Sequence, residues 1–206
     1  MLFDLEAWLA AIPVSPPIVQ VGATVLRRRA AEVDAAQRST PAFARLVDVM
    51  VDVMRTAPGV GLAAPQIGVP LRVFVAEDDE ERLSRLTDEA RALRGRVGLP
   101  LTVLVNPTVV ATSRDEATFY EGCLSVRGYG ALVARAAAVH VTAVDASGRP
   151  VLLDLAGWPA RIMQHEMDHL DGTLYVDRML SRSLAGEDEL GRLSALPVAE
   201  VMKELF

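Results

Sequence analysis

Two histidines and a glutamate near the end of the chain have the types and spacing of a metal-dependent hydrolase. The stretch Gln164–Leu170 reads Gln-His-Glu-Met-Asp-His-Leu and so contains His-Glu-x-x-His. Residues four apart lie on one face of a helix, so His165 and His169 can bind one metal ion together. Glu166 is offset by about a hundred degrees of helical turn and can act on a water bound to that metal. Many metalloproteases share this pattern, so it does not by itself identify the enzyme.

The residues that flank this stretch predict the helix that the histidines need. Trp158 and Pro159 are typical of a helix entry, because proline is tolerated in the first turn. Gly172 provides a glycine stop just beyond the motif. The alternative is two surface histidines on an ordinary amphipathic helix. Only three histidines occur in the whole chain and two of them fall in this motif, which favours the metal site.

A metal held by two histidines needs a third protein ligand and an open position for water. Zincin-type proteases take theirs downstream, but no histidine follows His169 and the nearest acids are Asp171 and Asp177. Cys123 is the better candidate, because its thiolate is a soft, charged ligand. Taken alone, a single cysteine is most often a small buried hydrophobe. His140, outside the motif, is interpreted as an ordinary strand residue.

Residues 59–68, Gly-Val-Gly-Leu-Ala-Ala-Pro-Gln-Ile-Gly, form a small, sparingly polar segment. They lack the third glycine of a dinucleotide site and the Lys-Ser/Thr pair of a phosphate loop. A backbone exposed through glycine can approach an extended peptide and bond to it as a strand does. Gln66 is a lone amide that can donate to a carbonyl oxygen. The segment alone leaves open the alternative of a tight turn with Gln66 on the surface.

The composition limits the class of protein. A chain of 206 residues predicts one compact domain, and no apolar run reaches the ~18 residues that span a bilayer. The formal net charge is −6 and the only dense basic run is 27–29, so a nucleic-acid site is not expected. Residues 1–17 carry acids where a secretory signal has basic residues, and a single cysteine excludes an internal disulfide. These features predict a cytoplasmic protein without a membrane site.

The remaining pattern predicts mixed helices and strands. Thr40 and Pro41 open a helix with apolar residues at helical spacing. Residues 77–96 predict one surface helix without chemistry, with an apolar stripe at Leu86, Ala90 and Leu93. The tail predicts two short helices, at 178–183 and 198–205. Strands are predicted over 71–76, over 101–105 with a stop at Asn106-Pro107, over 108–120 with a turn at 113–115, and over 131–144 and 151–153.

Three segments together resemble the peptide deformylase family, namely Gly59–Gln66, Glu121–Ser125 and Gln164–Leu170 in that order. The resemblance covers roughly residues 18–180. It implies an α+β fold in which antiparallel sheets surround a central metal-binding helix, in a single domain of residues 1–206 with a helical tail at 180–206. It also implies removal of the formyl group from N-formylmethionine at the start of new bacterial polypeptides. Nascent chains are then the partners, with ribosome proximity expected, and the chain is a monomer or a homodimer.

By position, the resemblance assigns the metal ligands to Cys123, His165 and His169. A cysteine with two histidines suits zinc. The family resemblance implies ferrous iron in the cell instead, with nickel or cobalt as active substitutes. One divalent metal ion is expected, and the residues do not decide among these four.

The resemblance also assigns roles around the metal. Glu166 is the general base and then the general acid. Gln66 and the backbone amide of Leu124 stabilise the developing oxyanion. The glycine-loop backbone pairs with the substrate peptide and an apolar pocket accepts the methionine side chain. The residues assigned to this binding are Val60, Gly61, Trp158 and Ile162.

The chain departs from many family members at Gly130, where a larger residue is common, in the insertion 77–96 and in the tail after 180. Two other functions stay open at this point. A zincin-like metalloprotease predicts a third ligand downstream and no role for Cys123. A non-catalytic protein with a structural metal predicts a closed fourth ligand position, for which no residue is evident.

Overall fold

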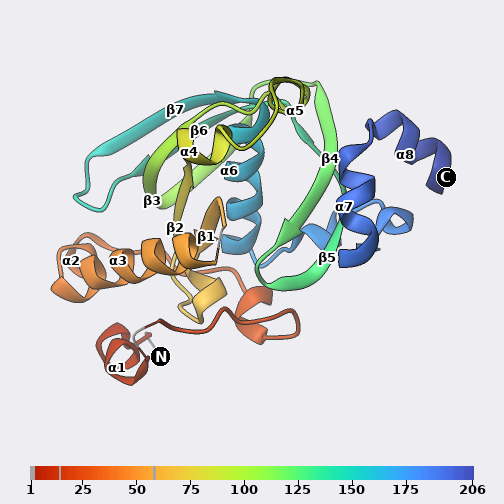
Figure 1. Ribbon diagram of the computed structural model, residues 1–206. Coiled ribbons are helices and arrows are strands. Elements are labelled where there is room, and N and C mark those ends of the chain that lie inside the picture. The colour runs from red at the N-terminus through yellow and green to blue at the C-terminus, as the bar shows by residue number, and fades with distance from the viewer. Residues whose placement is uncertain (1–2, 14, 58) are drawn as a thin grey trace.

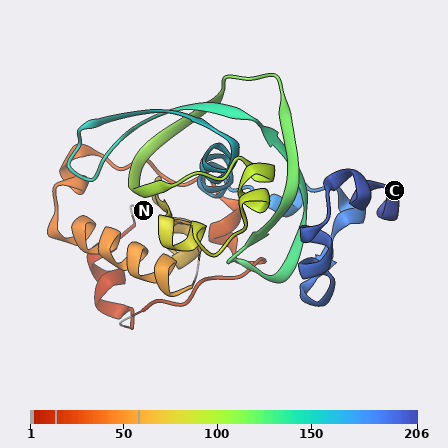
Figure 2. The same cartoon turned by 45° about the horizontal axis from the view of Figure 1, so that its top comes forward.

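The computed structural model describes residues 3–13, 15–57 and 59–206 as two antiparallel sheets around one central helix (Figures 1 and 2). The five-stranded sheet has the order β1 (Gly61–Ala63), β2 (Val73–Asp78), β3 (Leu99–Ala111), β6 (Ala138–Val144) and β7 (Pro150–Ala156). The three-stranded sheet has the order β4 (Glu116–Cys123), β5 (Val126–Ala136) and β8 (Ala185–Gly186). The predicted α+β fold is therefore confirmed.

Helix α6 (Gly157–Leu170) lies between the two sheets and carries the histidine motif. Pro159 lies in its first turn, and Gly172 follows the helix with a φ of 75°, which is the predicted glycine stop. One face of α6, with Ala160 and Met163, packs in an apolar cluster against the five-stranded sheet. The histidines face the three-stranded sheet, so the helix joins the core to the site.

The helix predicted at Thr40–Pro41 is present as α3 (Pro41–Thr56). The Thr40 hydroxyl accepts a hydrogen bond from the N–H of Phe43, which satisfies a donor in the first turn. Its apolar face, including Leu46 and Met50, is buried against β1 and β2. The helix thereby fixes the start of the glycine-rich segment that follows it.

The predicted stop at Asn106-Pro107 is wrong, because β3 continues to Ala111. Asn106 adopts a φ of 51°, and the register shifts between Val105 and Thr108, so the strand passes through a bulge. The Asn106 side chain accepts from the N–H of Val33 at 2.9 Å and donates to its carbonyl at 2.8 Å. These two bonds hold a conformation that few non-glycine residues adopt.

The single helix predicted over 77–96 is also wrong. Two short helices replace it, α4 (Glu80–Leu83) and α5 (Asp88–Arg94). The side chains of Asp79 and Thr87 each accept from a backbone N–H and start a new helix, which divides the segment. Leu83 is fully buried whereas Leu93, in the predicted stripe, is 53% exposed.

The tail contains one predicted helix and one that the sequence did not reveal. The helix predicted at 198–205 is α8 (Val198–Leu205), but 178–183 forms only a short 3-10 turn, Ser181–Ser183. Helix α7 (Glu187–Ala195) was not predicted. A Cβ on Gly130 would lie 2.7 Å from Leu190 of α7, so the missing side chain at Gly130 makes room for this helix.

The remaining segments complete the framework. The run predicted as one strand over 131–144 is two strands, β5 and β6, which separate at Ala137. No helix within the described residues is long and apolar enough to cross a membrane. The other helices are α1 (Leu5–Ala11) and α2 (Ala35–Arg38), and the other 3-10 turns are Thr24–Arg27, Ala64–Ile67 and Tyr175–Asp177.

Candidate active site

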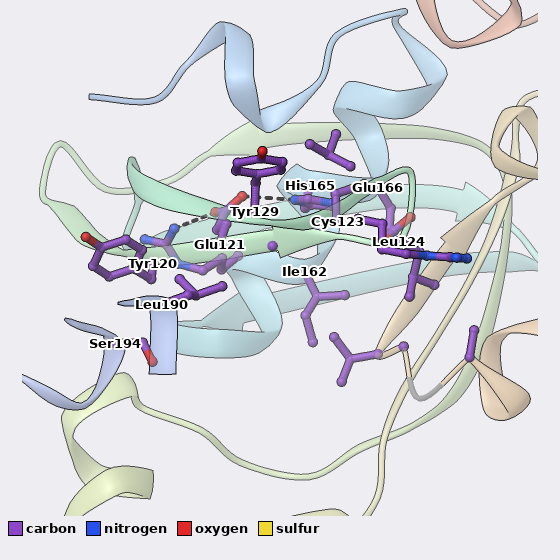
Figure 3. A pocket seen from close by; sticks show the side chains of 18 of the residues that line it. Tyr120, Glu121, Cys123, Leu124, Tyr129, Ile162, His165, Glu166, Leu190 and Ser194 are labelled. Carbon is purple, nitrogen blue, oxygen red and sulfur yellow. Dashed lines mark hydrogen bonds and ion pairs between the residues drawn. The ribbon is translucent and has the colours of Figure 1, made fainter. Parts of the chain in front are cut away.

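The fold brings the three predicted ligands together. Cys123 ends strand β4 and lies beside His165 of α6 (Figure 3). His169 follows His165 one turn later on the same helix. One ligand atom from each of the three residues lies within 4.8 Å of the others, and Cys123 Sγ is 3.3 Å from His169 Nε2. A thiolate with two imidazoles is a donor set that suits a divalent transition metal and leaves a position open for a further ligand.

Glu121 orients the first histidine, a role that the sequence did not predict. Its Oε2 is 2.9 Å from Nδ1 of His165, which leaves Nε2 of the same ring free to face a metal. Glu121 also accepts two hydrogen bonds of 2.8 Å from Arg135 and one from Arg161. Burial would raise the pKa of Glu121, but its bonds with Arg135 and His165 outweigh burial and hold that pKa well below its usual range. The signal that the sequence offered was the place of Glu121 at the start of the segment Glu121–Ser125.

The buried charges extend to a second carboxylate on α6. Asp168 accepts from Arg135 at 2.6 Å and from Arg178 at 2.7 Å. Arg135 therefore bridges Glu121 and Asp168. Such a network fixes the ring of His165 before any metal binds, which is what an ordered metal site requires.

Glu166 is buried but not paired. Glu166 is 4% exposed, and its Oε2 has no hydrogen-bond partner within the described part of the chain. Burial raises the pKa of Glu166 to about 7, against the opposing charges of His165 and Arg135. A Cβ on Gly61 would lie 2.6 Å from Cδ of Glu166, so glycine is required where β1 passes the carboxylate. An unpartnered carboxylate beside a potential metal site is suited to proton transfer.

Gln66 is buried at 2% exposure, so the alternative of a surface glutamine is wrong. Its Oε1 accepts from the N–H of Ala63 at 2.8 Å, and this bond orients the amide. The Nε2 group then points to Cys123 Sγ at 3.6 Å and to Ser125 Oγ at 3.4 Å. The glycine-rich segment thereby presents a fixed N–H donor at the ligand cluster.

The turn after Cys123 is held from two sides. Gln20 donates to the carbonyl of Leu124 at 3.0 Å, and the N–H of Ser125 lies 3.4 Å from Cys123 Sγ. A Cβ on Gly59 would lie 2.8 Å from Leu124 Cδ1, so the glycine-rich segment packs directly on this turn. Neither Gln20 nor Ser125 was assigned a role from sequence. The contacts of Gln20 with Leu124 and of the Ser125 hydroxyl with Gln66 join distant parts of the chain.

A cavity of about 770 Å³ opens in front of these groups. The four residues predicted to bind substrate, Val60, Gly61, Trp158 and Ile162, all line it, together with Glu166, Gln66 and Leu124. The segment 77–96, which was expected to carry no chemistry, also contributes to the wall through Arg94 and Arg96. Helix α7 contributes Leu190 and Ser194.

The two acids downstream of the motif do not reach the ligands. Asp171 pairs with Arg72 at 2.7 Å, and Asp177 pairs with Arg27. Neither belongs to the ligand group, whereas Cys123 does. The zincin-like alternative therefore has no support. Cys123, His165 and Glu166 line one cavity, and His169 belongs to the same ligand group. This arrangement is typical of a hydrolase with a group that can bind a metal ion.

Comparison with known proteins agrees with this class. Residues 15–184 match the sequence model of the family described as polypeptide deformylase. The chain is 50% identical over 189 residues to peptide deformylase 1 of Streptomyces coelicolor, covering 92% of this chain and 84% of that protein. It is 44% identical over 174 residues to the mitochondrial peptide deformylase of Homo sapiens, covering 83% of this chain and 72% of that protein.

Solved structures agree as well. A class I type b peptide deformylase from Acinetobacter baumannii with Met-Ala-Ser bound superposes with a TM-score of 0.70 at 32% identity, covering 80% of this chain and 98% of the other. A peptide deformylase from Synechococcus elongatus in complex with actinonin superposes with a TM-score of 0.67 at 33% identity, covering 83% of this chain and 87% of the other. The chain belongs to the polypeptide deformylase family and is a hydrolase that removes the N-terminal formyl group from polypeptides.

Proposed function

We propose that Cys123, His165 and His169 bind one divalent metal ion and that formyl-methionyl peptides are hydrolysed there. This proposal rests on the three ligand atoms that lie within 4.8 Å of one another. The unpartnered carboxylate of Glu166 lies on α6, the helix that carries both histidines. The chemistry that a bound divalent ion supplies is that of a Lewis acid, which polarises a carbonyl and lowers the pKa of water.

Glu166 is the proton carrier in this proposal. Its buried carboxylate takes a proton from the attacking water and then delivers it to the leaving amine, so one group serves as base and acid. Because Glu121 fixes His165 and Gly61 leaves room for the carboxylate, the position of Glu166 is set before substrate binds. Proton transfer then needs little movement of the protein.

Two donors stabilise the oxygen on which charge develops. The Nε2 group of Gln66 is one, because the bond from Ala63 aims it at the ligand cluster. The backbone N–H of Leu124, in the turn that Gln20 holds, is the other. Fixed donors at a site shielded from water are the arrangement that stabilises an oxyanion.

The substrate peptide extends along the glycine-rich segment. The backbone of Val60 and Gly61 pairs with it, and the methionine side chain enters the cavity between Trp158 and Ile162. The tripeptide in the Acinetobacter baumannii relative supports a peptide ligand. A formyl group is small, so a narrow site accepts it and excludes an internal peptide bond.

The identity of the metal and the cellular setting complete the proposal. Ferrous iron is the expected metal in the cell, with zinc, nickel or cobalt able to occupy the same ligands. Residues 1–206 act as one catalytic domain that includes its helical tail, in the cytoplasm and near ribosomes, as a monomer or a homodimer. The formal net charge of −6 supports the absence of a direct nucleic-acid site.

Formate release tests this proposal. The purified protein is given formyl-Met-Ala-Ser and, in parallel, unformylated Met-Ala-Ser and an acetylated control. Formate should appear only from the first peptide, should stop after chelation and should return when a divalent metal is added. Cleavage of an internal peptide bond, or formate release that is unaffected by complete metal removal, would contradict the proposal.

A further inference from the structure

The cavity continues beyond the residues assigned to methionine. Strand β4 is an edge strand of its sheet, and four consecutive residues from Tyr120 to Cys123 line the cavity. Figure 3 shows the cavity running from Cys123 to Leu190 and Ser194 of α7. The far end therefore lies along the free edge of β4, away from the metal ligands.

Three guanidinium groups surround the ring of Trp158, which is also part of the proposed methionine pocket. The Cζ atoms of Arg94, Arg96 and Arg161 lie 5.2, 5.5 and 5.9 Å from its centroid. Arg96 makes two bonds to the buried Asp78, at 2.6 and 2.9 Å. Arg161 is paired with Glu121. The charges of Arg96 and Arg161 are thus already balanced by carboxylates.

Arg94 is different. Its Nη2 donates to the backbone carbonyl of Ser194 at 3.0 Å, and it forms no ion pair with a carboxylate of the described residues. Glu187 also lines the cavity but makes no ion pair with Arg94. Burial, and then the charge of Arg96, lower the pKa of Arg94, which is the effect of an unbalanced cation in a partly desolvated place.

An extended substrate brings its third residue toward this cation. Side chains of a strand alternate, so the first and third point to the same side and lie about 7 Å apart. With the formyl group at Cys123 and methionine beside Trp158, the third side chain lies farther along the edge of β4, toward α5 and α7. We propose that Arg94 selects substrates with an acidic third residue, an inference that rests on the proposed function.

Competition between three peptides tests this proposal. Formyl-Met-Ala-Glu, formyl-Met-Ala-Gln and formyl-Met-Ala-Lys are used with amidated C-termini, because a free carboxylate at the third residue would imitate the effect. The ratio of kcat/KM between two peptides in one mixture does not depend on the fraction of active enzyme. Any general damage from a substitution therefore cancels.

The wild-type protein should prefer the Glu peptide to the Lys peptide by roughly threefold to tenfold at low salt, the range for a partly desolvated ion pair. The preference should shrink at about 0.5 M salt. Arg94→Gln should remove it and Arg94→Glu should reverse it. Arg91→Gln is the matched control, since Arg91 lies on the same helix, pairs with Glu80 at 3.8 Å and should leave the preference unchanged.

Two results would overturn the proposal. One is equal use of all three peptides by the wild-type protein. The other is a preference that persists in Arg94→Gln, which would place the selecting charge on Arg127 at the exposed rim of the same cavity. If the three peptides are hydrolysed rapidly and equally, the role of Arg94 is refuted and the proposed function stands. If no formylated peptide is hydrolysed, the proposed function itself is refuted.

Discussion

Replacing Glu121 by glutamine removes the charge that two arginines and a histidine share. The Glu121 side chain is 4% exposed, and it balances Arg161 and, with Asp168, Arg135. Removing one partner of a buried ion pair lowers the free energy of unfolding by about 3–5 kcal/mol. Because glutamine keeps one acceptor, we expect Glu121→Gln to lower it by about 3 kcal/mol. In a chain of this size that lowers Tm by about 6–12 °C.

The same substitution should weaken metal binding. The amide can still accept from Nδ1 of His165, but it no longer stabilises the ring electrostatically, so we expect a 10–100-fold loss of affinity. Thermal unfolding and metal titration of Glu121→Gln would be compared with Glu77→Gln. Glu77 pairs at 2.7 Å with Arg55, which is half exposed, and its loss should cost under about 1 kcal/mol. Equal small effects of the two substitutions would refute the assigned role of Glu121.

The remaining predictions concern the ligands, the glycines, oxidation and the pocket. Cys123→Ala should abolish stoichiometric metal binding while the protein stays folded, as elemental analysis and circular dichroism would show; a full metal complement would contradict this. Gly61→Ala should reduce kcat at least tenfold with metal retained, because its Cβ meets the Glu166 carboxylate; unchanged kcat would exclude that contact. Gly130→Leu should displace α7 and lower Tm, because the new side chain meets Leu190; an unchanged melting curve would argue against this packing. The iron form should lose activity in air or peroxide faster than the nickel form, so equal half-lives would count against a ferrous thiolate site. Formyl-Met peptides should exceed formyl-Ala peptides in kcat/KM by roughly 10- to 200-fold, and parity would exclude the proposed methionine pocket.

The site was more predictable from sequence than the elements around it. His165 and His169 are neighbours by helical spacing alone, and the absence of a downstream ligand pointed to Cys123. Glu121 and Gln20 act through contacts between distant parts of the chain, which no local pattern encodes. The role of Glu121 depends on β4 lying beside α6, and that of Gln20 on its lying beside the turn after β4.

The errors in the fold have local physical causes. Asn106-Pro107 is typical of a strand end, but tertiary bonds to Val33 hold Asn106 in a bulge. The helix predicted over 77–96 begins at the cap of Asp79 and is divided by a second cap at Thr87, a signal that the sequence did contain. Helix α7 has a weak apolar pattern, and its position depends on the space at Gly130.

We propose above all that Glu166 transfers protons and does not hold the metal. Glutamine keeps the size and the hydrogen-bonding capacity of this side chain but cannot accept and return a proton. Metal content and kcat on formyl-Met-Ala-Ser should be measured on one preparation of Glu166→Gln. We expect full metal content, an unchanged fold and a fall in kcat of roughly 10²–10⁴-fold. Near-normal kcat with metal retained, or loss of the metal, would contradict this proposal.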